Sequence, residues 1–181
     1  MKKPNIYQNQ SQQLLHLFEQ AGSSEKVMCV PMDYAKNDHL VMFCNGHGDI
    51  LRKPFSVKNT PEGIAYIDDQ VTRSCRRRGI KKKHVFFGGE DANSFAKNFV
   101  STLRSKGFVV ANVNAHDAKK QRSNVQASTD RIDLMGIATM LLNCRANCCA
   151  AQSGIYRNLR TLVRHRRRLV QMLTEVKNRV H

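Results

Sequence analysis

The chain has 181 residues, which is enough for one domain with its own core and an appended segment. Thirty Lys and Arg residues against fourteen Asp and Glu residues leave a net charge of +16, which favours a polyanionic partner. This charge alone does not distinguish DNA, RNA and an anionic lipid surface. No run of about 18 apolar residues is present, and the N-terminal residues lack the apolar centre of a secretion signal, so we expect a cytoplasmic protein with no membrane span.

Six cysteines lie mostly within apolar stretches. Without a secretion signal, this distribution is typical of reduced, buried thiols in a cytoplasmic protein. Cys144, Cys148 and Cys149 are close enough in sequence to be considered as zinc ligands, but no second Cys/His pair has the spacing of a zinc finger. We therefore expect buried thiols and no zinc site.

Residues 1–25 are polar and rich in glutamine around one short apolar stretch, which indicates a leader segment with a short helix. The compact domain is expected over residues 26–145. It begins with three β-prone runs separated by turn residues, at 27–34, 39–44 and 50–57. These runs should form an antiparallel meander.

A helix is expected next, because Thr60 can cap it, Pro61 suits its first position, and apolar residues recur at helical spacing as far as Cys75. The elements that follow are read from their apolar periodicity and their glycines. They are a strand at 84–89, a helix at 92–103 ended by Gly107, a strand at 108–114, a basic connection at 116–128 and a helix at 129–143.

Residues 146–181 are expected to form a separate part of the chain, in which a small, polar joint leads into a long basic helix at 155–181. Its apolar residues alternate spacings of three and four, interrupted once by Arg166, at Leu159, Leu162, Leu169, Leu173, Val176 and Val180. This is the seam of a coiled coil, which predicts pairing with a partner helix and a homo-oligomer.

The predicted order is therefore three strands followed by alternating helices and strands. Such an order implies an α/β fold with a mixed five-stranded sheet and helices on its faces, followed by the long coiled-coil helix.

Four acids stand at the ends of these predicted elements. Asp33 closes the first strand, Glu90 closes the fourth, and Asp130 and Asp133 open the helix after the fifth. If strands one and four are neighbours, Asp33 and Glu90 reach the same edge of the sheet, and a helix crossing that edge adds two carboxylates. Converging carboxylates need a cation between them, and hard oxygen ligands select Mg²⁺ or Mn²⁺.

Each acid also has a structural explanation. Asp130 can be a helix N-cap, Asp133 can stabilise the helix dipole, Asp33 can end a strand in a turn, and Glu90 can lie on the surface. Taken together, their placement favours a two-metal site that activates a nucleophilic oxygen and stabilises a leaving group.

Several segments resemble the N-terminal half of the DEDD insertion-sequence transposases, the recombinases guided by a bridge RNA. They are VPMDYAKNDH (30–39), GGED (88–91), VNAHDAKKQR (113–122), QASTDRIDLMGIA (126–138) and YRNLRTLVRHRRRLVQMLTEVKNRV (156–180). The resemblance covers residues 27–181, and its most specific part is T-D-R-x-D at 129–133 followed by the basic helix.

The resemblance implies an RNase H-like (RuvC-like) fold with Asp33, Glu90, Asp130 and Asp133 as catalytic acids that bind Mg²⁺ or Mn²⁺. It implies an enzyme of transposition, a transposase that cleaves and transfers DNA strands, with the DNA of a mobile element and its target and a structured guide RNA as partners. The basic helix would join protomers and grip RNA. The protein would act in a prokaryotic cytoplasm, at the nucleoid.

The sequence departs from the family in two places. The usual E-A-T-G-x-Y run around the second acid reads GGEDANSF (88–95), so Asp91 competes with Glu90 for that role. Family members also continue into a second domain with a nucleophilic serine, and no serine before His181 is assigned that role. The C-terminal serine-bearing domain is therefore expected to be absent, and the isolated chain to be incomplete for catalysis.

Basic clusters supply the expected contacts with nucleic acid, although a solvated surface is their ordinary explanation. The residues that we expect to contact nucleic acid are Arg76, Arg77, Arg78, Lys81, Lys82, Lys83, Lys119, Lys120, Arg122, Arg131, Arg160, Arg164, Arg166, Arg167 and Arg168.

Three hypotheses remain open from the sequence. The first is the transposase domain. The second is a resolvase-like nuclease that cleaves by itself with metal-activated water. The third is an RNA-binding module that keeps the fold without catalysis. Cleavage by the isolated chain in Mg²⁺ would favour the second, and tight binding of structured RNA without cleavage would favour the first or the third.

Overall fold

The computed structural model describes residues 10–90, 95–114, 117, 130–148 and 155–180, with the side chains of Asp130, Tyr156, Arg157, Arg160 and Val180 left undescribed. The chain divides into two compact units, Met1–Cys148 and Cys149–His181. In chain order the first unit contains α1 (Gln12–Ala21), η1 (Ser24–Lys26), β1 (Met28–Asp33), β2 (Asp38–Asn45), β3 (Ile50–Lys58), α2 (Pro61–Arg78), η2 (Lys82–His84), β4 (Val85–Glu90), α3 (Lys97–Ser105), β5 (Val109–Asn112) and α5 (Asp130–Leu142), and the second contains α6 (Ile155–Val180).

The strands of the first unit form one mixed sheet in the order β3-β2-β1-β4-β5. β1, β2 and β3 pair antiparallel, whereas β1, β4 and β5 pair parallel. The expected meander followed by β/α alternation is therefore confirmed.

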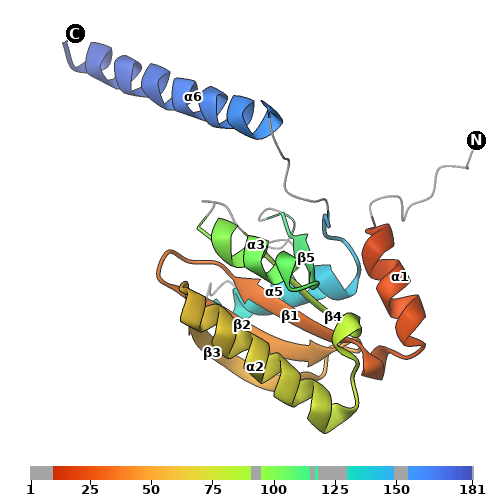
Figure 1. Ribbon diagram of the computed structural model, residues 1–181. Helices are drawn as coiled ribbons and strands as arrows, with labels where there is room; N and C mark the ends of the chain where they lie inside the picture. The colour runs from red at the N-terminus through yellow and green to blue at the C-terminus, as the bar shows by residue number, and fades with distance from the viewer. Residues whose placement is uncertain (1–9, 91–94, 115–116, 118–129, 149–154, 181) are drawn as a thin grey trace, which may run out of the picture. The chain divides into compact units, whose positions relative to one another are not determined.

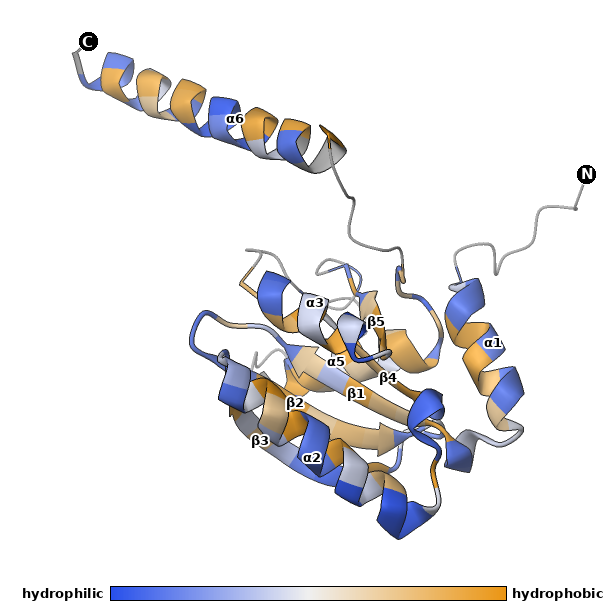
Figure 2. Cartoon of the chain, in the orientation of Figure 1, coloured by the Kyte–Doolittle hydropathy of each residue, from blue (hydrophilic) through white to orange (hydrophobic). Residues whose placement is uncertain are grey.

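Helices cover both faces of this sheet (Figure 1). On one face, α2 and α3 bury a core that includes Phe43, Phe87 and Phe99. On the other face, α5 and α1 bury a second core that includes Cys29, Phe86 and Leu134. Figure 2 shows apolar colouring along the strands and on parts of the helices that cover them, as expected for a sheet buried on both faces.

The start and the end predicted for α2 are both confirmed by its capping residues. The Oγ1 atom of Thr60 accepts a hydrogen bond from the backbone N–H of Gly63 at 3.2 Å, and Pro61 is the first residue of α2. Gly79 ends the helix in the left-handed conformation, with φ of 62°. Local sequence signals therefore determine where α2 begins and ends.

The N-terminal residues contribute to the core. α1 lies within residues 1–25, the segment expected to be a leader, yet Leu14 and Leu17 are buried in the same core as α5. The backbone N–H of Ser11 also donates to the carbonyl oxygen of Cys144 at 2.7 Å. The described part of this segment therefore packs against the first unit and helps to bury the core that it shares with α5.

The second unit contains one described helix, α6. Its described apolar side chains are exposed, among them Leu159, Leu162, Leu169, Leu173 and Val176. In the part of the chain that the structure describes, no helix has the length and apolar character needed to cross a membrane.

Candidate metal and nucleic-acid site

Asp33 and Glu90 are partners across the pairing of β1 with β4. Each is the last residue of its strand, and because the two strands run parallel, both residues stand at the same edge of the sheet. Both are half-buried. The first and fourth strands are therefore neighbours, which is the condition under which these two acids reach the same edge.

The helix α5 crosses the sheet over β1. A β-carbon at Gly88 would lie 2.3 Å from a Leu141 methyl, so the end of α5 packs directly on β4, and a Leu142 methyl lies near Gly48 in the turn after β2. That turn is beside the start of β1, because Asn45 pairs with Met28. The first turn of α5 is therefore directed toward the end of β1 where Asp33 stands, as Figure 1 shows.

This first turn carries the other two expected acids. α5 begins at Asp130, whose side chain lies outside the described part of the structure. Asp133 is half-buried and its Oδ1 atom is shielded from solvent. A carboxylate held partly away from water at this position is a suitable hard ligand for a cation.

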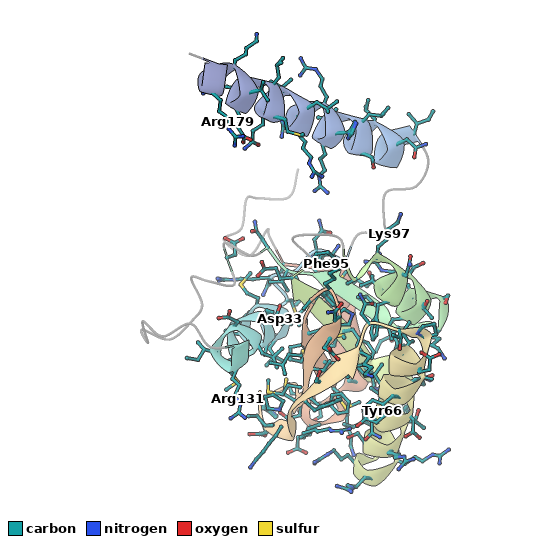
Figure 3. All side chains as sticks on the ribbon, turned by 90° about the vertical axis from the view of Figure 1, so that its left-hand side faces the viewer. Asp33, Tyr66, Phe95, Lys97, Arg131 and Arg179 are labelled. Atoms are coloured by element: carbon teal, nitrogen blue, oxygen red, sulfur yellow. The ribbon has the colours of Figure 1, made fainter. Side chains whose placement is uncertain are left out.

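Two side chains other than the four acids, those of Asn59 and His39, hold the loops at this edge of the sheet in place. The Nδ2 atom of Asn59 donates to the carbonyl oxygen of Lys36 at 3.2 Å and to that of Phe95 at 3.0 Å. It thereby ties the loop after β1 to the segment before α3. Figure 3 labels both Phe95 and Asp33, which lie toward the same end of the sheet in that view.

His39 supports the residues that follow Asp33. Its Nδ1 atom accepts a hydrogen bond from the backbone N–H of Ala35 at 3.2 Å, and its ring is fully buried between those of Tyr34 and Phe99. The turn that leaves β1 is thus packed against α3. No sequence signal marked Asn59 or His39, because their partners are backbone atoms of distant loops or rings from other elements.

Among the described side chains, no three His, Cys, Asp or Glu residues are arranged to hold a metal ion. Asp130 is outside that set, so the four-acid cluster remains a prediction. The described cysteines are all free, and burial raises the pKa of Cys144 to about 11. The burial of Cys29, Cys44, Cys75 and Cys144 agrees with the expectation of buried thiols.

Most of the basic residues expected to contact nucleic acid are exposed in the structure. They are Arg76, Arg77, Arg78, Lys81, Lys82, Lys83, Arg131, Arg164, Arg166, Arg167 and Arg168. Lys82 is already paired with Asp68 at 2.7 Å, which reduces the charge that it offers a ligand. Lys119, Lys120, Arg122 and the side chain of Arg160 lie outside the described residues, as does Asp91.

The fold is the expected α/β architecture, with a mixed five-stranded sheet flanked by helices. A family model described as a transposase, that of the DEDD enzymes of the IS110 type, matches residues 30–181. The chain therefore belongs to the IS110-type DEDD transposase family.

The chain is also similar to two solved structures of RuvC from Thermus thermophilus. One is 11% identical with a TM-score of 0.43, and the match covers 68% of this chain and 100% of that chain. The other, in complex with a Holliday junction substrate, is 10% identical with a TM-score of 0.44 and covers 68% and 99%. No curated protein matches the sequence.

Proposed function

We propose that this chain is the RuvC-like catalytic part of a transposase that cleaves and transfers DNA strands under the direction of a bridge RNA. The observation that carries the proposal is the placement of Asp33 and Glu90 as neighbours at one edge of the sheet, with the start of α5 directed to the same edge. Membership of the transposase family supports DNA as the substrate.

Asp33, Glu90, Asp130 and Asp133 would hold Mg²⁺ or Mn²⁺. The donor set fits such an ion, because carboxylate oxygens are the ligands that these cations prefer. When bound, the ion would stabilise negative charge that develops on phosphate oxygens. The contribution of the chain is to place its acids on two strands and one helix, which are rigid supports, and to keep Asp133 partly shielded from water.

The partners follow from charge and from exposed surface. A net charge of +16 and the exposed arginines of α2 and α6 suit the DNA of the mobile element, its target and a structured guide RNA. The exposed apolar residues of α6 suit a second copy of the same helix, in a homo-oligomer. Such a protein would act in a prokaryotic cytoplasm, at the nucleoid.

Metal binding by the purified chain tests the site. An ion that binds only the folded state raises the melting temperature, so MnCl₂ should stabilise the wild type. The variants Asp33→Asn, Glu90→Gln and Asp130→Asn should lose this stabilisation, whereas Asp38→Asn, which removes an exposed acid at the start of β2, should keep it. If Asp91→Asn loses the stabilisation and Glu90→Gln keeps it, Asp91 is the second acid.

Nucleic-acid assays separate the proposal from its alternatives. We expect the chain to bind DNA and structured RNA without exchanging DNA strands by itself. Nicking by the chain alone in Mg²⁺, lost in Asp33→Asn, would identify a self-sufficient nuclease instead. Tight RNA binding with no metal-dependent stabilisation would identify a binding module that keeps only the fold.

A further inference from the structure

A cleft between β3 and α2 gathers positive charge away from the acids. It has a volume of about 350 Å³ and is lined by Leu51, Arg52, Gln70, Arg73, Ser74 and Arg77. The lining residues from α2 recur at spacings of three and four, so they share one face of the helix. Three of the six lining side chains, those of Arg52, Arg73 and Arg77, end in guanidinium groups, and they come from two elements, β3 and α2.

The guanidinium group of Arg52 is already held in one orientation. It lies 3.7 Å from the centroid of the Phe55 ring, donates to the hydroxyl oxygen of Tyr66 at 2.9 Å and donates to Oε1 of Gln70. Fixing a flexible arginine normally costs conformational entropy when a ligand binds. The contacts with Phe55, Tyr66 and Gln70 already hold the Arg52 guanidinium group in place. An anion that binds its remaining N–H groups would therefore immobilise little more of the side chain, which favours binding.

The charge of the cleft is only partly neutralised. Arg73 is paired with Asp69 at 2.8 Å. Within the described part of the chain, no carboxylate is paired with Arg52 or Arg77. Guanidinium groups bind phosphate through two parallel hydrogen bonds, a geometry that an ammonium group does not offer. The cleft therefore suits a phosphate group.

The cleft lies apart from the acid edge. Arg52 pairs with Phe43, and the neighbouring residue Cys44 pairs with Cys29 near the start of β1. Asp33 stands at the other end of that strand. A nucleic acid in contact with both places would therefore extend along the length of the sheet.

We propose that the β3–α2 cleft is a phosphodiester-binding subsite that holds the backbone of a nucleic acid through Arg52 and Arg77. The inference rests on the proposed function in that it needs a nucleic-acid partner. The phosphodiester can belong to RNA or to DNA, since the chemistry of the cleft is common to both.

Fluorescence anisotropy of the full chain with a labelled DNA duplex and, separately, a labelled RNA hairpin tests the subsite. The variants are Arg52→Gln, Arg52→Lys and Arg77→Gln. Lys53→Gln is the matched control, because Lys53 is the next residue of β3, is exposed and does not line the cleft. Thermal unfolding establishes that each variant folds, and Arg77, being exposed, provides a test that does not disturb the Arg52 contacts.

Each cleft variant should weaken binding of the nucleic acid that occupies the cleft about tenfold, as expected for one lost charge-assisted contact. The slope of log affinity against log salt should fall by about one in the two Gln variants. Lys53→Gln should weaken binding by no more than about twofold. The nucleic acid that shows the loss identifies the source of the phosphodiester.

If Lys53→Gln weakens the binding of both nucleic acids as much as the cleft variants do, the inference is wrong, whereas the proposed function is unaffected. Wild-type affinity in Arg52→Lys would overturn it as well, because the fixed guanidinium group would then contribute nothing beyond charge. A wild-type chain that binds neither nucleic acid would instead contradict the proposed function, and the inference with it.

Discussion

Gly89 of β4 lies so close to Met32 of β1 that a β-carbon at Gly89 would stand 2.1 Å from the Met32 carbonyl oxygen. The same atom would lie 2.7 Å from Cε2 of Tyr34. These contacts are one residue away from Asp33 and Glu90 in each strand. The spacing of the two acids therefore depends on the absence of a side chain at residue 89.

We expect Gly89→Ala to lower the free energy of unfolding by about 1–3 kcal/mol, because the added methyl group forces the two strands apart. Urea denaturation measures this loss. Gly107→Ala is the control: its φ is 86°, but nothing lies within 4 Å of its β-carbon, so it should show only the backbone strain of about 1 kcal/mol. Equal losses in the two variants would contradict the steric explanation.

Asn59 should be a positioning residue for the acid edge. Asn59→Ala removes both hydrogen bonds that tie the loop after β1 to the segment before α3, at a cost of about 1–2 kcal/mol. We expect the midpoint of Mn²⁺ binding to move to higher concentration, as measured by calorimetry on the folded chain. Asn98→Ala, at an exposed position of α3, should leave that midpoint unchanged. Unchanged Mn²⁺ affinity in a destabilised Asn59→Ala would show that the contacts are structural only.

The apolar stripe of α6 should drive self-association. Leu169→Lys places a charge within the stripe and should shift the chain toward monomers, because an apolar seam cannot solvate an ammonium group. Light scattering after gel filtration gives the mass of each species. Gln171→Lys adds the same charge about 200° further around the helix, nearly opposite the stripe, and should leave the mass unchanged. A monomeric wild type at high concentration would exclude the coiled coil.

His84 should make the fold sensitive to mild acid. Burial lowers the pKa of His84 from 6.5, and the charges of Lys83 and Lys81 lower it further. Below pH 6.5 the unfolded chain takes up a proton that the folded chain resists, so the free energy of unfolding should fall as pH drops from 6.5 through the folded pKa.

Denaturant midpoints measured between about pH 5 and pH 8 test this expectation, since the range brackets the ordinary histidine pKa. His84→Leu removes the titrating group and should flatten the profile. His47→Gln, at an exposed position of the β2–β3 turn, should retain the wild-type slope. A profile of His84→Leu as steep as that of the wild type would assign the acid sensitivity to other groups.

The strands and helices could be predicted because each is marked locally. Thr60 and Pro61 mark the start of α2, Gly107 follows the end of α3, and the order of the elements constrained the sheet enough to bring Asp33 beside Glu90. The packing of α1 was missed, because a short apolar stretch among glutamines shows no local sign of what it covers. Leu14 is buried in the same core as Cys29 and the apolar residues of α5, which are distant in the sequence.

The candidate site was predicted only in part, for a similar reason. The acids lie at element ends, which a sequence reveals. Arg52 and Arg77 belong to different elements, and their convergence depends on how α2 lies across β3. Asn59 acts on backbone carbonyls that any residue could supply. Long-range convergence of this kind leaves no spacing pattern to detect.

The residues that follow α5 are held by hydrogen bonds from two parts of the first unit, the segment before α1 and the strand β5. Ser11 holds the carbonyl oxygen of Cys144, the Nε2 atom of Gln10 donates to the carbonyl oxygen of Asn143 at 3.1 Å, and Asn147 exchanges two backbone hydrogen bonds with Asn112 of β5. A force applied through residues 149–154 would meet these bonds before it reached the turn that carries Asp133. These hydrogen bonds would therefore resist tension on the chain before the acids were displaced.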